Sequence, residues 1–164
     1  MSIFVVEGPD NAGKTQLAQY LAKELNALYI KAERPRRGPD LLTYQSILEQ
    51  AQQYSGCVIA DRHVAISEPI YGTICRGDHQ LNHGDIGMCL RRLTAVIYCR
   101  PPDEHVIGKI AERGHMAGVA QNVGAIVSAY DAFFSGRPRV QYDFTQQTAE
   151  HVARGLMTLS RRYP

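Results

Sequence analysis

Residues 8–15 of the chain read GPDNAGKT and match the pattern G-x-x-x-x-G-K-[ST] at Gly8, Gly13, Lys14 and Thr15. Glycines in these places allow positive φ angles and a close approach of the backbone to a ligand. Successive N–H groups of such a loop, at the start of a helix, form a site that the helix macrodipole makes favourable for anions. Lys14 is expected to reach the β- and γ-phosphates of a nucleotide, and the Thr15 hydroxyl is expected to bind Mg²⁺. The stretch therefore predicts a nucleoside triphosphate site.

The expected nucleotide site covers this loop and the residue that follows it. ATP is the expected phosphoryl donor, because the chain contains no N-K-x-D motif of the kind that reads guanine. The residues expected to bind ATP are Gly8, Pro9, Asp10, Asn11, Ala12, Gly13, Lys14, Thr15 and Gln16.

A second stretch with residues suited to chemistry is VIADRH, which ends an apolar run with Asp61 and Arg62. Ligands of doubly wound sheets bind at the carboxyl ends of the strands, so both side chains are expected at the mouth of the site. Asp61 is expected to hold Mg²⁺ or its waters, as Thr15 is. Arg62 can clamp an acceptor phosphate through two parallel hydrogen bonds. A surface ion pair at a strand end is the alternative interpretation of the same two residues.

A third stretch, KIAERGHMAGVAQN, places Arg113 before two glycines and several small residues. This composition is typical of a mobile lid, here about residues 113–122, that carries a cation to the reacting group. The alternative is a solvent-facing arginine on an ordinary loop. An acceptor clamp and a lid together favour phosphoryl transfer, because the transferred group carries negative charge that must be stabilised away from water. A nucleotide-dependent switch or binding module would need no acceptor clamp.

The elements that must position these residues alternate between strand and helix along the whole chain. Apolar β-branched runs predict strands, and apolar residues at helical spacing predict helices. We therefore expect an α/β protein with a three-layer P-loop NTPase fold, in which a five-stranded parallel sheet has helices on both faces and carries a small lid. The expected strands are 2–7, 28–32, 57–61, 94–99 and 139–144, the expected helices are 14–26, 41–54, 86–93, 104–114, 123–135 and 148–162, and residues 62–82 are expected to be irregular or short-helical.

Composition limits the classes of protein that the chain can represent. Its 164 residues, 45% of them hydrophobic and 21% charged, are those of a single globular domain, 1–164. The net charge of +2 does not by itself indicate a nucleic-acid-binding protein. No signal peptide or membrane-spanning stretch is evident, and the four cysteines form no C-x-x-C pair. We therefore expect a reduced protein of the cytoplasm, or of the host cytoplasm if it is viral, with no membrane partner.

Several of these stretches together resemble thymidylate kinases, a family of P-loop kinases. VVEGPDNAGKT is similar to their IEGPDGAGKT, and ADRH followed by Ser67 and Tyr71 is similar to their D-R-Y…S-x-x-x-Y segment. TAVIYCRPPDEHVIGKIAERG, VGAIVSAYDAFF and RVQYDFTQQTAEHVARGL resemble the later elements, so the resemblance covers most of the chain. It implies a kinase that uses ATP and Mg²⁺ to phosphorylate a thymidine-type deoxynucleotide such as dTMP. Since thymidylate kinases are commonly dimers, it also implies a homodimer.

The resemblance also implies roles for individual residues. Asp10 would face the acceptor sugar or position its phosphate through the metal ion, and Arg62 would bind that phosphate. Tyr71 would line the acceptor pocket, and Arg113 would close over the transferring phosphoryl group. Pro35 would mark a turn near the acceptor. The residues implied in catalysis are Lys14, Arg62, Arg113 and Asp10, and those implied in acceptor binding are Asp10, Arg36, Arg37, Arg62, Ser67 and Tyr71.

The chain departs from the family on the acceptor side. One residue is inserted between Arg62 and Ser67, and Gly72 replaces the usual glutamine. The segment between the second and third strands is reduced to the single helix 41–54. Some viral relatives phosphorylate the hydroxymethyl group of 5-hydroxymethyluracil within DNA, which needs a basic rim and room for an extruded base rather than a closed pocket. Arg34, Arg36 and Arg37 could supply such a rim, so a free deoxynucleotide and a modified base in viral DNA both remain open as acceptors.

Overall fold

The structure is a computed structural model that describes residues 2–32, 50, 54, 56–79, 81–108 and 118–160. Several sequence predictions fall outside these residues. They concern most of the expected helix 41–54, the start of the expected lid, and the side chains of Arg34, Pro35, Arg36, Arg37 and Arg113.

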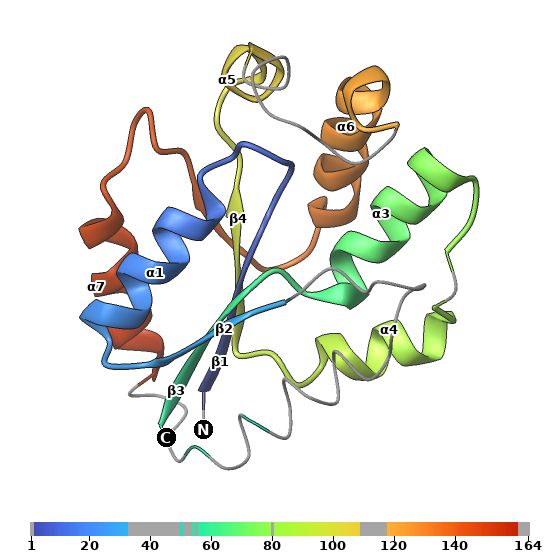
Figure 1. The fold of residues 1–164 in the computed structure, drawn as a ribbon. Coiled ribbons are helices and arrows are strands. Elements are labelled where there is room, and N and C mark those ends of the chain that lie inside the picture. The colour runs from blue at the N-terminus through green and yellow to red at the C-terminus, as the bar shows by residue number, and fades with distance from the viewer. Residues whose placement is uncertain are drawn as a thin grey trace.

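Five parallel strands form one sheet at the centre of the molecule (Figure 1). Their order is β2-β3-β1-β4-β5, so the first strand lies in the middle and each neighbouring pair is parallel. This confirms the predicted α/β fold and its five-stranded parallel sheet. The strands are β1 (Ser2–Glu7), β2 (Leu28–Lys31), β3 (Cys57–Asp61), β4 (Ala95–Cys99) and β5 (Val140–Tyr142).

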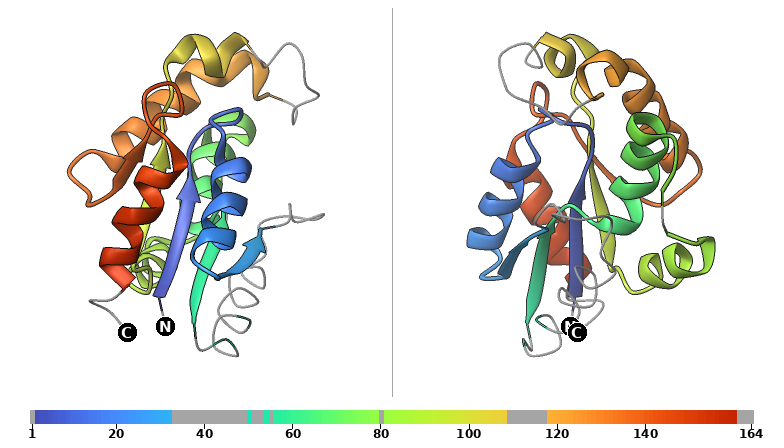
Figure 2. Two further views of the ribbon diagram at one scale, coloured as in Figure 1. Left: turned by 90° about the vertical axis from the view of Figure 1, so that its left-hand side faces the viewer. Right: turned by 45° about the vertical axis from the view of Figure 1, so that its right-hand side comes forward.

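Helices cover both faces of the sheet and complete the three layers (Figures 1 and 2). α1 and α7 pack together on one face, and α3 and α6 pack together on the other. α4 lies against α3, and α5 lies against α6. No helix within the described residues is long and apolar enough to cross a membrane. The helices are α1 (Lys14–Glu24), α3 (Val64–Arg76), α4 (His83–Leu90), α5 (Asp103–Gly108), α6 (Val123–Phe134) and α7 (Ala149–Ser160), with a 3-10 turn at Ala120–Asn122.

The central strand β1 is buried on both faces, as the apolar run IFVV at residues 3–6 predicts. Its side chains alternate between two cores because successive residues of a strand point to opposite faces. Phe4 and Val6 belong to the core beneath α1 and α7, together with Leu21 and Leu156. Val5 belongs to the core beneath α3 and α6. The loop that follows β1 therefore starts from a strand that is buried throughout and paired on both sides.

α3 differs from the irregular or short-helical structure predicted for residues 62–82. It is a helix of 13 residues that contains Pro69. Proline removes a helical hydrogen bond, and glycine has a low helix propensity. Pro69 and Gly72 therefore disfavour a helix when only local sequence is considered. Burial of Ile66 and Ile70 in the core on the α3 and α6 face outweighs that preference. The helix ends at Gly77, which has a φ of 82° and acts as a left-handed C-cap.

α4 begins three residues earlier than the predicted helix 86–93. The Asn82 side chain caps its first turn by accepting a hydrogen bond from the Asp85 N–H at 2.8 Å. Asparagine is among the residues most favoured at a helix N-cap.

Gly8 shows how tightly the end of β1 is packed. Its φ is 146°, and an added Cβ would lie 2.3 Å from the carbonyl oxygen of Cys99 on β4. We expect Gly8→Ala to lower the free energy of unfolding by about 2–4 kcal/mol, because both the steric clash and the backbone conformation are unfavourable. Urea denaturation followed by circular dichroism measures this change.

Gly155→Ala is the matched control for that experiment. Gly155 is exposed on α7, and an added Cβ there meets no described atom within 4 Å. The substitution should stabilise the protein by about 0.5–1 kcal/mol through helix propensity. Equal effects of the two substitutions would contradict the packing of Gly8 against β4.

Candidate nucleotide and acceptor site

The loop between β1 and α1 has the backbone geometry that a phosphate-binding loop requires. Gly8, Asn11 and Gly13 all have positive φ angles, of 146°, 64° and 79°. Asparagine tolerates this region better than most residues do. Gly13 is the N-cap of α1 and, as a glycine, has no side chain that could cap the helix. The loop thus leads into a helix N-terminus whose backbone N–H groups and dipole favour an anion. Figure 2 shows the loop at the edge of the sheet where β1 ends.

Lys14 is a buried cation within this loop. Its side chain is 5% exposed, and its ammonium group donates a hydrogen bond to the Pro9 carbonyl. Burial lowers the pKa of Lys14 to about 8, and the nearby charge of Arg62 contributes in the same direction. Asp10 and Glu7 oppose this shift. Bound phosphate would favour the charged form, so the group has the position and the chemistry expected of a phosphate-binding lysine.

Thr15 and Asp61 meet at the other side of the loop. The Thr15 hydroxyl donates to the Asp61 carboxylate at 2.7 Å, and the Tyr29 hydroxyl donates to the same oxygen at 3.1 Å. Burial and Asp61 raise the pKa of Tyr29 to about 12, so its hydroxyl stays a donor at neutral pH. Hydroxyl and carboxylate oxygens are the ligands that Mg²⁺ prefers in proteins. The two residues predicted to hold Mg²⁺ are thus brought together and fit that ion.

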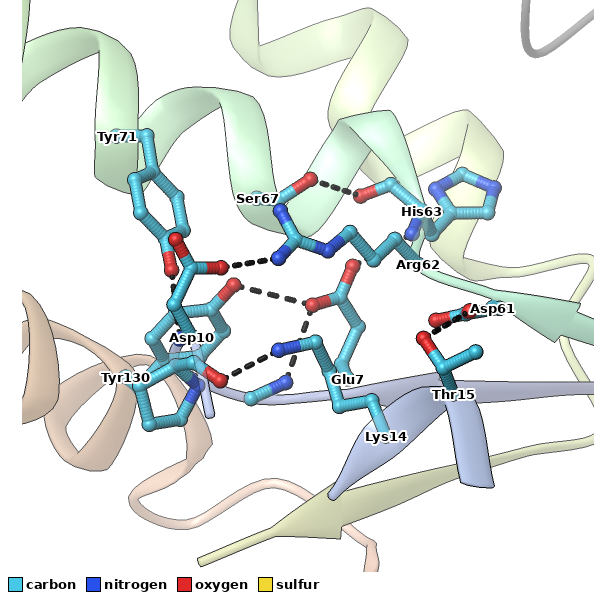
Figure 3. A network of polar contacts seen from close by, with 12 residues as sticks. Glu7, Asp10, Lys14, Thr15, Asp61, Arg62, His63, Ser67, Tyr71 and Tyr130 are labelled. Carbon is cyan, nitrogen blue, oxygen red and sulfur yellow. Dashed lines mark hydrogen bonds and ion pairs between the residues drawn. The ribbon is translucent and has the colours of Figure 1, made fainter. Parts of the chain in front are cut away.

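Arg62 and Asp10 form an ion pair between the end of β3 and the loop (Figure 3). The Asp10 side chain is 9% exposed, and the Arg62 side chain is 28% exposed. The guanidinium also lies over the ring of Tyr71, 5.8 Å from its centre. The Tyr71 hydroxyl oxygen in turn accepts a hydrogen bond from the Asp10 N–H at 3.0 Å. Three residues that the resemblance to thymidylate kinases implies for the acceptor side therefore form one contiguous cluster.

His63 and Ser67 belong to the first turn of α3. His63 is 1% exposed, and its Nδ1 accepts a hydrogen bond from the Ala65 N–H, so it caps the helix. Burial lowers the pKa of His63 to about 4, which keeps the ring neutral at physiological pH. The Ser67 hydroxyl donates to the His63 carbonyl at 3.1 Å. An acceptor-binding role for Ser67 stays a prediction.

Glu7 and Tyr130 are two further residues of the site that were not predicted from the sequence. The Glu7 carboxylate is fully buried and accepts hydrogen bonds from the Gly8 N–H, the His63 N–H and the Tyr130 hydroxyl. Burial raises the pKa of Glu7, and the His63 N–H, the charges of Arg62 and Lys14 and the Gly8 N–H oppose that shift. An acidic residue at the end of a fully apolar strand is an anomaly visible in the sequence. Its partner on α6 is 123 residues away and carries no local signal.

The expected lid is described only at its C-terminal end. Gly118 has a φ of 86°, and an added Cβ would lie 3.3 Å from the Cβ of Cys75 on α3. Val119 is 1% exposed and belongs to the core beneath α3 and α6. This end of the segment is anchored to the body of the protein. The assignment of Arg113 to a moving lid stays a prediction.

No protein-family model matches the chain, and no curated protein matches it in sequence. Solved structures do match. YorR from Bacillus subtilis, in complex with phosphorylated GDP, is 19% identical, with a TM-score of 0.73, over 98% of this chain and 96% of its own. Deoxyadenosine kinase from M. mycoides with bound dATP is 16% identical and has a TM-score of 0.67. The match covers 97% of this chain and 99% of the kinase. Thymidylate kinase from Candida albicans is 14% identical and has a TM-score of 0.62. The match covers 98% of this chain and 91% of the kinase.

These similarities confirm the predicted fold class. The chain has the three-layer α/β P-loop fold that these proteins share, with the glycine-rich loop between the first strand and the first helix. At identities below 20% they do not separate thymidylate kinases from the other kinases of this fold.

The lowered pKa of Lys14 predicts how nucleotide affinity depends on pH. With a pKa of about 8 in the free protein, Lys14 is mostly charged at pH 7 and mostly neutral at pH 9. Because only the ammonium form attracts phosphate, we expect the affinity for ATP to fall about ten-fold between pH 7 and pH 9. Calorimetric titration of the protein with ATP at the two pH values measures this.

Lys14→Arg is the control, because a guanidinium stays charged over this range. Its affinity for ATP should vary by less than about two-fold between pH 7 and pH 9. A fall of the same size in this variant would mean that a group other than Lys14 causes the pH dependence.

Proposed function

We propose that the protein transfers the γ-phosphoryl group of ATP to a thymidine-type deoxynucleotide acceptor, such as dTMP. The observation that carries this proposal is the juxtaposition of two sets of groups. The loop with Lys14 and Thr15 suits a triphosphate, and the cluster of Asp10, Arg62 and Tyr71 lies directly beside it (Figure 3). A protein that only binds or hydrolyses nucleotide has no need of the second set. The matched deoxyadenosine and thymidylate kinases support a nucleoside or nucleotide acceptor.

On the donor side, backbone N–H groups of the loop and the Lys14 ammonium would bind the β- and γ-phosphates. Mg²⁺ held by Thr15 and Asp61 would supply positive charge that offsets the charge developing on the phosphate oxygens. Lys14 is one of few buried cations in the described part of the chain, so its charge acts in a medium that screens it weakly. These residues would lower the barrier by electrostatic stabilisation and positioning, without a covalent enzyme intermediate.

On the acceptor side, Arg62 would bind the acceptor phosphate with the guanidinium N–H groups that Asp10 leaves available, since one of its nitrogens pairs with Asp10. Tyr71 would form the wall of the pocket, because it is buried against Tyr130 with ring centres 6.1 Å apart. An oxygen of the acceptor phosphate would attack the γ-phosphorus as the bond to the β-phosphate oxygen breaks. The products would be ADP and the nucleoside diphosphate of the acceptor, such as dTDP.

A second candidate acceptor is a hydroxyl group, as in 5-hydroxymethyluracil within DNA. The ion pair between Asp10 and Arg62 favours it, because the carboxylate already neutralises the guanidinium and would repel an incoming phosphate dianion. A hydroxyl acceptor carries no charge and must lose a proton as it attacks. Asp10 would accept that proton, while the bond between the γ-phosphorus and the β-phosphate oxygen breaks and ADP leaves.

Replacement of Lys14 tests the donor site. We expect Lys14→Ala to reduce phosphoryl transfer from ATP at least about 100-fold, because it removes a preorganised cation at the phosphates. Transfer of label from [γ-³²P]ATP to the acceptor measures this. Lys23→Ala is the control, since Lys23 is an exposed lysine of α1. Undiminished transfer by Lys14→Ala would refute the proposed donor site.

Replacement of Asp10 separates the two acceptors. Labelled ATP is offered with dTMP or with DNA that contains 5-hydroxymethyluracil, to the wild type and to Asp10→Asn. If the wild type labels dTMP, and Asp10→Asn lowers the rate of that transfer by no more than about ten-fold, the result supports the nucleotide kinase. The reason is that a phosphate acceptor needs no general base. Label in the DNA, with a loss of about 100-fold or more, supports the hydroxyl acceptor. The DNA reaction should also weaken steeply between 50 and 200 mM salt, and the dTMP reaction should not.

A further inference from the structure

Glu7 is a fully buried carboxylate to which the proposed phosphoryl transfer assigns no step. Its hydrogen bonds come from three separate segments. Figure 3 shows the one from Tyr130. Oε1 accepts from the His63 N–H after β3 at 2.5 Å. Oε2 accepts from the Gly8 N–H of the loop at 3.1 Å and from the Tyr130 hydroxyl of α6 at 3.0 Å. Burying a carboxylate is unfavourable unless it is fully hydrogen-bonded, and here each bond ends on an element of the site.

The backbone of Arg62 is the feature that this carboxylate constrains most directly. Arg62 has a φ of 76°, in the left-handed region that residues other than glycine and asparagine seldom adopt. Such conformations persist where the surroundings hold them from several sides. The Arg62 N–H is bound to the Val6 carbonyl at 3.0 Å, and the next N–H, that of His63, is bound to Glu7. The last two residues of β1 thus hold the peptides on both sides of Arg62.

The held backbone directs the side chain. From this conformation the guanidinium pairs with Asp10 and lies over the ring of Tyr71. With the Arg62 N–H held by Val6, a rotation about the N–Cα bond of Arg62 would move the His63 N–H away from Glu7 and turn the guanidinium away from both Asp10 and Tyr71. The position of the guanidinium therefore depends on a hydrogen bond that Arg62 itself does not make.

We propose that Glu7 is a positioning residue for the acceptor, whose carboxylate holds Arg62 in the left-handed conformation that brings the guanidinium to Asp10. The proposal rests on the proposed function, in which Arg62 and Asp10 receive the acceptor. Tyr130 holds the same carboxylate from α6, and its ring packs edge-on against Tyr71. One buried group thus fixes both the cation and the aromatic wall of the acceptor side.

Glu7→Gln tests this role. Its amide keeps the size of the side chain but offers one acceptor oxygen to three donors and turns an N–H toward another. We expect kcat/KM for the acceptor to fall about 10- to 100-fold, as for other groups that orient a site residue. The dissociation constant for ATP, measured by calorimetry, should change by less than about three-fold, because Lys14 and the loop amides remain in place.

A double-mutant cycle separates positioning from a general loss of structure. If Glu7 acts through Arg62, adding Glu7→Gln to Arg62→Ala should lower kcat/KM for the acceptor by less than about three-fold. Tyr130→Phe, which removes one of the three donors and keeps the ring, should show the same coupling with a smaller effect, and it serves if Glu7→Gln does not fold. Equal losses in both backgrounds, or an ATP affinity that falls as far as kcat/KM, would overturn the proposal.

A crystal structure of Glu7→Gln, or of Tyr130→Phe in its place, decides the question without any transfer assay. We expect φ of Arg62 to leave the positive region and the pair with Asp10 to open. An unchanged Arg62 conformation with the pair intact would overturn the proposal. A wild-type protein that phosphorylates no acceptor would refute the proposed function alone, because this structural readout does not depend on turnover.

Discussion

The parallel pairing of β1 with β3 is the constraint on which the site depends. Val6 lies opposite Asp61, so both strands end at the same edge of the sheet. The loop of residues 8–15 leaves one strand, and the Arg62 segment leaves the other. Asp10 and Arg62 are 52 residues apart in the chain and meet because the register fixes where the strands end. A shift of the pairing by one residue would turn these side chains to the opposite face.

Charges at this edge are arranged so that two cations lie close together. Lys14 and Arg62 repel one another, which contributes to the lowered pKa of Lys14. The negative charges of Asp10 and Glu7 partly offset this repulsion, since both favour the charged form of Lys14. Breaking a buried pair is expensive because it leaves an uncompensated charge. A polyphosphate that contacts both cations would relieve their repulsion. This electrostatic argument favours a single anion site that contains both Lys14 and Arg62.

Much of the fold and part of the site could be predicted from the sequence, and the limits have physical causes. The strands and the loop geometry depend on local patterns, so they were predictable. Thr15 and Asp61 were each expected to bind Mg²⁺, and the structure brings the two side chains into contact. α3 was missed because Pro69 disfavours a helix locally, whereas burial against the sheet decides its conformation. Glu7 and Tyr130 were missed because their hydrogen bond joins residues that only the completed fold brings together.

The start of α3 is held in place by hydrogen bonds that also reach the segment around Arg62. His63 is buried, neutral and bound to the first turn of the helix, and its N–H is held by Glu7. The Ser67 hydroxyl donates a hydrogen bond to the His63 carbonyl, so it points back toward the start of its own helix. Arg62, just before this turn, is fixed to β1, because its N–H is bound to the Val6 carbonyl. The cation at the centre of the cluster is therefore held by the sheet, whereas Ser67 is held by the first turn of α3.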